Sequence, residues 1–177
     1  MFIAPQVLKG AYIIGASGGS GVLLVRDEKT GRLNGPAFYA IGGASIGFQI
    51  GGEASEVILL LMTERGVSSL LSNSLKLGAD AGLAVGPVGM GASAATANLS
   101  ADILSFSRSK GLYGGVSLDG AVVAISGDLN DAYYGKRVTP TDILIRHEVT
   151  NPHAGSLIAA TVQLMCDVPD RLRQKGC

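Results

Sequence analysis

Glycine is the feature of this sequence that most restricts its fold. It accounts for 26 of the 177 residues, which is about twice its share in an average soluble protein. Many of these glycines fall inside short apolar runs, where a glycine gives up side-chain packing and marks a bulge, a bend or a close backbone approach. The pattern predicts an α+β, β-rich chain: short, glycine-punctuated strands in a strongly curved antiparallel sheet or small barrel, with a few short helices.

The expected strands are separated by glycine-rich or polar stretches. Strand-like runs occupy 11–14, 22–25, 37–41, 45–50, 56–62, 103–107, 112–118 and 122–125, and 76–85 alternates loosely. The glycine-rich stretches 15–21, 42–43 and 51–52 are expected to lie between strands, and the polar stretch 26–32 is typical of a hairpin turn. The first third of the chain therefore reads as a β-meander.

Helical spacing appears at a few later points. Thr63 is expected to cap a helix over 63–73, because apolar residues then recur at helical spacing. Residues 139–142 begin like a capped helix with Pro140 near its first position. Residues 129–134 are expected to form a helical turn, and 156–165 a further helix closed by Pro169.

Charge and cysteine content exclude several functional classes. The chain has 14 basic and 14 acidic residues, so it lacks the basic excess typical of nucleic-acid binding. Two cysteines and two histidines are too few for a usual zinc site or a disulfide framework. We therefore expect no metal, no cofactor and no nucleic-acid partner. Of three charge-free stretches, 33–52 and 81–101 are too rich in small residues for membrane spans, and 149–166 has only thirteen residues after His153, which fits a buried helix better. The first residues do not resemble a signal peptide.

Catalytic motifs are weak. Two G-x-S-x-G matches surround Ser17 and Ser45, but both serines lie between expected strands, whereas a nucleophile elbow leads into a helix. The only histidines, His147 and His153, follow the β region. Such matches arise by chance in a glycine-rich chain, so we expect no enzymatic activity.

Basic residues form local clusters. Arg108 and Lys110 alternate with Ser107 and Ser109 before a glycine, and cations beside hydroxyls in a turn can hold a phosphate. Further cations that could form a basic rim are Arg26, Lys29, Arg32, Lys136 and Arg137. If they share one rim, each would contribute about 1 kcal/mol to binding anionic head groups. The alternative is a set of solvated turns with ordinary surface charge.

Several segments in order along the chain resemble the SYLF domain family. They are 10–15, 19–24, 35–39, 47–52, 55–57, 86–89 and above all 105–120. The resemblance covers roughly residues 1–135 and implies a non-catalytic domain that binds anionic phospholipids or phosphoinositides. It also implies an association with actin for fungal relatives, and export or lipidation for bacterial ones.

The chain departs from the family pattern in two respects. Family members usually carry a helical segment before the element seen here as Ala4–Val7, and this chain starts almost at that element. These residues show no SH3 or FYVE pattern, so we expect an actin-related role to be less favoured. We expect a lipid-binding domain over 1–146 and a C-terminal helical tail over 147–177.

A scaffold role is the alternative to lipid binding. Apolar, glycine-rich strand edges can pair between chains, so the sequence also fits a self-associating structural protein of the bacterial envelope, and a homo-oligomer is an expected partner state. We expect an envelope location if the full gene encodes a leader, and a cytoplasmic one otherwise.

Overall fold

The computed structural model describes residues 1–11, 14–27, 30–46, 51–72, 74–85, 102–110, 118 and 120–166. Its elements, in chain order, are β1 (Phe2–Ala11), β2 (Ile14–Arg26), β3 (Leu33–Ile46), β4 (Gly51–Leu61), α1 (Glu64–Leu71), β5 (Ser74–Lys76), β6 (Leu83–Val85), β7 (Ile103–Lys110), β8 (Val122–Ile125), α2 (Gly127–Tyr134), α3 (Pro140–Leu144) and α4 (Ala154–Cys166).

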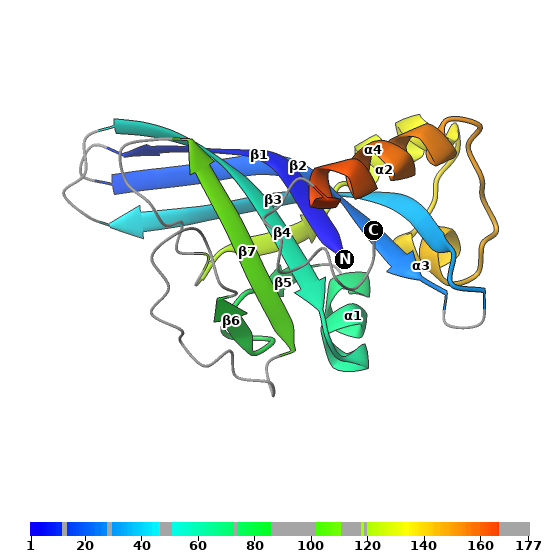
Figure 1. Ribbon diagram of the computed structural model, residues 1–177, viewed down its shortest axis with the longest axis horizontal. Coiled ribbons are helices and arrows are strands. Elements are labelled where there is room, and N and C mark those ends of the chain that lie inside the picture. The colour runs from blue at the N-terminus through cyan, green and yellow to red at the C-terminus, as the bar shows by residue number, and fades with distance from the viewer. Residues whose placement is uncertain are drawn as a thin grey trace.

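The described strands form one curled sheet in the order β5-β8-β3-β2-β1-β4-β7-β6. Neighbouring strands are antiparallel except β6 and β7, which are parallel. The edge strands β5 and β6 are joined by only the residues 77–82. A flat sheet of this many strands would set its edges about 34 Å apart, whereas such a connection reaches only about 25 Å. The sheet must therefore curl, as Figure 1 shows, and the expected β-rich, strongly curved fold is confirmed.

The main core fills the inner, concave face of this half-barrel. Phe2, Leu23, Tyr39 and Leu59 are almost fully buried there, and the Phe2 and Tyr39 rings meet edge to face with centroids 6.3 Å apart. Strands alternate their side chains between two faces, so these residues share one side of the sheet. From the helices, Leu70, Ile143 and Leu144 join the same cluster.

A β-bulge in β1 explains a proline in a central strand. Ile3 pairs with Val22 and Gln6 with Ser20, so two residues of β1, Ala4 and Pro5, oppose the single Gly21. A bulge is one of the few places where a strand tolerates the missing N–H of proline. It increases the local twist and bends the strand, which helps the sheet to curl.

Helix α2 is fixed to β3 by one buried side chain. The Asn130 amide oxygen accepts the Phe38 N–H at 2.8 Å, and its nitrogen donates to the carbonyls of Phe38 and Ser126 at 3.0 Å. Asn130 therefore completes the backbone pairing of β3 just beyond the end of β8. The Phe38 ring packs against Tyr133 at 5.0 Å between centroids.

Several sequence expectations are confirmed. Helix α1 begins after Thr63, whose hydroxyl accepts the Gly66 N–H, and α3 carries a complete capping box on Thr139 and Asp142. The turn at 26–32 joins β2 to β3, the runs 37–41, 56–62, 103–107 and 122–125 overlap β3, β4, β7 and β8, and the helices at 129–134 and 156–165 correspond to α2 and α4.

Other expectations were wrong, mostly because glycine was read as loop. Residues 15–21 lie inside β2, 42–43 inside β3 and 51–52 inside β4. At some of these glycines a neighbouring strand lies too close for a side chain, and at others the strand surface simply carries none. The run 11–14 straddles the end of β1 and the start of β2, and 76–85 divides into β5, a turn and β6. The run 112–117, most of 45–50 and Pro169 lie outside the described residues.

Candidate functional site

The predicted Arg108/Lys110 cluster lies on a strand. Residues 107–110 form the end of β7, and their register partners on β4 run from Val57 to Ala54. Because a strand alternates its faces, Arg108 and Lys110 occupy positions on one face and the two serines positions on the other. The compact turn of hydroxyls and cations expected from the sequence is therefore not formed by these four residues; Gly111 lies outside the described residues.

A second set of cations gathers at the end of the molecule that carries the β2–β3 hairpin. The Tyr134 hydroxyl donates to the Pro36 carbonyl at 2.9 Å, which places the end of α2 beside the start of β3. Lys136 and Arg137 follow directly and are exposed. Helix α3 packs against β3, and its Leu144 lies beside Gly35 at the start of that strand. We call this region, with the hairpin, the hairpin end (Figure 1).

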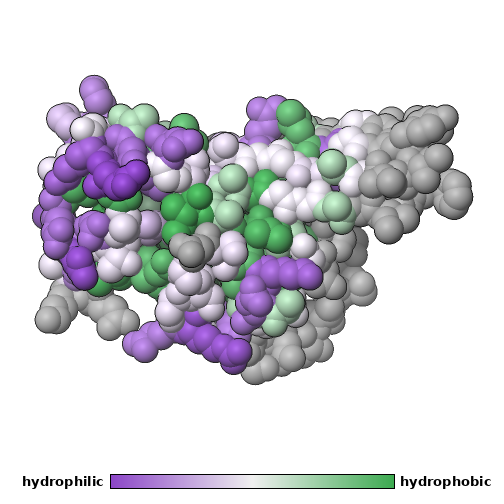
Figure 2. All heavy atoms as spheres, turned by 180° about the vertical axis from the view of Figure 1, so that it is seen from behind, coloured by the Kyte–Doolittle hydropathy of each residue, from purple (hydrophilic) through white to green (hydrophobic). Residues whose placement is uncertain are grey.

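The hairpin itself adds two described cations. Arg26 donates through Nε to the Gly31 carbonyl at 3.3 Å, and Arg26 and Arg32 are both exposed. Lys29 lies outside the described residues. Figure 2 shows this end, at the left of that view, covered largely by hydrophilic residues, whereas apolar residues gather near the middle of the face.

The two cation sets do not form one rim. Lys110 pairs with Ala54, which pairs through Leu8 with Gly18 of β2. Along β2, Arg26 lies about 26 Å beyond Gly18 at ordinary strand rise. The structure therefore brings Arg26, Arg32, Lys136 and Arg137 to one end and leaves Arg108 and Lys110 far from them.

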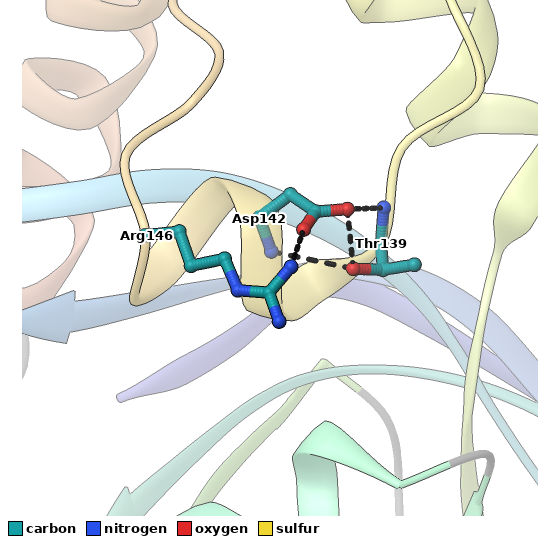
Figure 3. A network of polar contacts seen from close by, with 3 residues as sticks. All are labelled: Thr139, Asp142 and Arg146. Atoms are coloured by element: carbon teal, nitrogen blue, oxygen red, sulfur yellow. Dashed lines mark hydrogen bonds and ion pairs between the residues drawn. The ribbon is translucent and has the colours of Figure 1, made fainter.

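Two acidic residues at the hairpin end, Asp131 and Asp142, are engaged in internal contacts. The Asp142 carboxylate accepts the Thr139 hydroxyl at 2.6 Å and pairs with Arg146 at 3.1 Å, as Figure 3 shows. The Thr139 hydrogen bonds hold the pKa of Asp142 below its usual value. Asp131 accepts the Val138 N–H at 2.9 Å. These carboxylates fix the backbone around α3, although their charge still offsets part of the basic charge.

Sequence reasoning missed two exposed apolar side chains at or near this end. Leu129 of α2 is 44% exposed, and Ile145, which follows α3, is 48% exposed. The sequence carries no signal for this, because a leucine is ordinarily more buried than an asparagine, and here the burial of Asn130 depends on its bonds to Phe38 of β3. Large apolar side chains beside exposed cations are a combination found at surfaces that bind membranes.

The described residues hold little that suggests catalysis. Ser17 lies within β2 and donates to the Gly43 carbonyl at 3.3 Å, and β3, not a helix, follows β2. His147 and His153 are exposed and lie beyond α3. In this part of the chain no group of three or more histidine, cysteine or acidic side chains could hold a metal ion.

None of the helices within the described ranges is long and apolar enough to cross a membrane.

Comparisons with known proteins identify the family. The model of the Ysc84 family, described as "Las17-binding protein actin regulator", matches residues 42–164. "Protein YSC84" of Saccharomyces cerevisiae is 32% identical over 157 residues, which cover 86% of this chain and 33% of the relative. Human "SH3 domain-containing YSC84-like protein 1" is 32% identical over 141 residues, or 78% of this chain and 41% of the relative.

The chain spans only about a third to two fifths of the length of these relatives. No solved structure matches it. The family model covers well over half of the chain, and the resemblance to the SYLF family is thereby confirmed. This protein therefore belongs to the Ysc84 or SYLF domain family.

Proposed function

We propose that this chain is a non-catalytic module that binds anionic phospholipid head groups, phosphoinositides included, at a membrane surface. The observation that carries the proposal is the hairpin end, where the exposed cations Arg32, Lys136 and Arg137 lie in the same region as the exposed side chain of Ile145. Cations attract the head groups, and an apolar side chain gains free energy when it enters the boundary between head groups and acyl chains.

The charge at the hairpin end sets the expected strength of membrane binding. Asp142 already pairs with Arg146, so the binding charge comes from the cations of the hairpin and of the α2–α3 connection. Each exposed cation near an anionic surface contributes about 1 kcal/mol. Binding should therefore need anionic lipid and weaken as salt screens the attraction.

The pair on β7 supplies a competing location for the same function. The sequence favours Arg108 and Lys110 as the head-group ligands, and that prediction stands beside the hairpin end. Their different places in the fold allow the two locations to be tested separately, because each double substitution removes the same amount of charge.

Co-sedimentation with vesicles tests the proposal. Vesicles of phosphatidylcholine alone should not retain the chain, whereas vesicles that also contain phosphatidylserine or phosphatidylinositol bisphosphate should. We expect Lys136→Ala/Arg137→Ala to weaken binding by roughly tenfold or more. The matched variant Arg108→Ala/Lys110→Ala tests the β7 pair, whose role is refuted if vesicle binding stays unchanged. Failure of every vesicle composition to retain the chain, or turnover of a metabolite, would overturn the proposal.

Binding of a protein partner is the second candidate function. The family is described as Las17-binding, and a further relative, from Saccharomyces cerevisiae, is named "LAS seventeen-binding protein 3". Self-association as a scaffold is a variant of this candidate. Assemblies that grow with protein concentration in the absence of lipid would favour it over the lipid-binding module.

A further inference from the structure

The short segment between α2 and α3 is held at both of its ends. Before it, the Tyr134 hydroxyl donates to the Pro36 carbonyl of β3 at 2.9 Å. After it, the Val138 N–H donates to the Asp131 carboxylate of α2 at 2.9 Å. The segment therefore closes back onto the helix that it leaves. We call residues 135–138, which include two exposed cations, the cationic turn.

Two further features fix the backbone of the cationic turn. Gly135 ends α2 in the left-handed conformation, with a φ of 70°, which L side chains rarely adopt. Val138 is only 8% exposed and joins the main core. Between them Lys136 and Arg137 are exposed, and neither forms an ion pair with another described residue. The turn thus presents two adjacent cations on a fixed backbone.

Asp131 acts on this turn in two opposite ways. Its carboxylate accepts the Val138 N–H and so holds the turn closed, whereas its negative charge offsets part of the charge of the cations. Asp128, in the first turn of the same helix, is exposed and has no hydrogen-bond partner in the described part of the chain. The two carboxylates of α2 therefore share the electrostatic effect, but only Asp131 holds the turn.

We propose that Asp131 is a positioning residue, which holds the cationic turn in a shape that selects head groups with clustered phosphates, such as phosphatidylinositol bisphosphate, over singly charged ones such as phosphatidylserine. The inference rests on the function proposed above and adds its selectivity. Phosphates bind lysine and arginine through charge-assisted hydrogen bonds. The phosphates of one inositol ring keep fixed mutual distances, whereas single charges in a bilayer rearrange around any set of cations.

Preorganisation is the physical reason for the expected selectivity. Ordering a loop on binding costs free energy, and a turn that is fixed beforehand avoids that cost. A head group of fixed shape gains most from this, because its phosphates meet cations that are already in place. A fluid surface of single charges needs no such fit, so its attraction depends mainly on the total charge of the chain.

Three variants separate position from charge. Asp131→Ala removes a charge and the hydrogen bond, Asp131→Asn removes the charge but keeps an oxygen that can accept the Val138 N–H, and Asp128→Ala removes a charge only. The probes are phosphatidylcholine vesicles that contain either phosphatidylserine or phosphatidylinositol bisphosphate at equal total charge. The measured quantity is the selectivity, which is the ratio of the dissociation constants for the two kinds of vesicle.

The expected results differ between the two kinds of vesicle. All three variants should bind phosphatidylserine vesicles more tightly than the unmodified chain, since each has lost a negative charge. Asp131→Ala should lower the selectivity by about fivefold, which corresponds to one lost hydrogen bond. Asp131→Asn and Asp128→Ala should keep the selectivity of the unmodified chain. A destabilised fold would weaken binding to both vesicles alike and would not move their ratio.

A second substitution tests the proposal if Asp131→Ala does not fold. Tyr134→Phe releases the other end of the cationic turn from Pro36 and changes no charge. It should lower the selectivity in the same direction while leaving the binding of phosphatidylserine vesicles nearly constant. Full selectivity in this variant would contradict the proposal.

Soluble inositol trisphosphate distinguishes a membrane head group from a free phosphate. It carries phosphates of the same kind without acyl chains, so the exposed Ile145 gains nothing from it. It should displace the chain from bisphosphate vesicles only at a concentration at least about tenfold above that of the lipid. Displacement at equal concentration would assign the turn to a soluble ligand and overturn the proposal.

The unmodified chain keeps the two possible failures apart. If it binds neither kind of vesicle, the lipid-binding function itself fails, and the role of Asp131 fails with it. If it binds both kinds but shows no selectivity, or if Asp131→Ala keeps the full selectivity, only the role of Asp131 is overturned.

Discussion

The two halves of the sheet use the same four long strands in different ways. Near the hairpin end, β1 and β2 place Phe2 and Leu23 in the core, and α2 and α3 pack against β3. In the far half, the same strands are rich in glycine, alanine and serine, and Leu8, on the outer face, is 56% exposed. A residue type therefore has different consequences in the two halves.

Individual glycines of the long strands differ in how much space surrounds them. A Cβ atom at Gly21, next to the β1 bulge, would lie 2.5 Å from the Phe2 ring and 2.6 Å from the Ile3 carbonyl oxygen. A Cβ atom at Gly18 or Gly10 would meet nothing within 4 Å. At Gly21 glycine is required by close approach, whereas at Gly10 and Gly18 it leaves the sheet surface bare.

The largest expected effect comes from a substitution that removes the side-chain hydrogen bonds between α2 and β3. Asn130→Ala leaves the partly buried Phe38 N–H without a partner and removes the two bonds that the Asn130 amide donates, although the Phe38 carbonyl still accepts the Ser126 N–H. At about 1–3 kcal/mol for the unsatisfied N–H and about 1 kcal/mol for each of the other two bonds, we expect a loss of about 4 kcal/mol in the free energy of unfolding, measured by urea denaturation. Leu129→Ala, on the exposed side of the same helix, is the control and should change stability by under about 0.5 kcal/mol.

The second effect tests the two classes of glycine directly. Gly21→Ala should cost about 3 kcal/mol, because both the Phe2 ring and the backbone of Ile3 would have to shift. Gly18→Ala should be neutral or stabilising by about 0.5 kcal/mol, since it restricts the unfolded chain without a clash. Equal losses from the two substitutions in thermal denaturation would show that the halves do not differ.

The sequence allowed the fold class and most helices to be predicted, but not the meaning of individual glycines. Thr63 and Thr139 carry local capping patterns, so α1 and α3 could be located from neighbours in the chain. The role of Gly21 depends on Phe2, which lies across a strand pair. Such long-range contacts leave no periodic signal in the sequence.

The candidate site was predicted less well for the same reason. The residue types at 107–110 suggested a turn, yet their pairing with β4 makes them a strand. Lys136 and Arg137 lie near Arg32 only because Tyr134 fixes the end of α2 beside Pro36. The grouping of cations is thus a product of tertiary packing, which spacing along the chain does not reveal.

A third, smaller effect compares two neighbouring tyrosines of α2. The Tyr134 hydroxyl donates to Pro36, and burial raises its pKa to about 12. The Tyr133 hydroxyl is shielded from solvent and has no hydrogen-bond partner among the residues that the structure describes. We expect Tyr134→Phe to lower the free energy of unfolding by about 1 kcal/mol, and Tyr133→Phe to leave it unchanged or raise it slightly. A loss of stability from Tyr133→Phe would mean that this hydroxyl has a partner.

The smallest effect concerns the capping carboxylate of α3 and is seen as a pH dependence. The Thr139 hydroxyl and N–H hold the pKa of Asp142 below the ordinary value of 3.8. A carboxyl whose pKa is lowered by folding contributes stability above its unfolded pKa and loses it as the pH falls through the folded pKa. We therefore expect Asp142→Asn to lower the thermal midpoint slightly at pH 7 and to match the unmodified chain near pH 2. If the thermal midpoints of Asp142→Asn and the unmodified chain still differed by the same amount at pH 2, Asp142 would stabilise α3 by packing and not by charge.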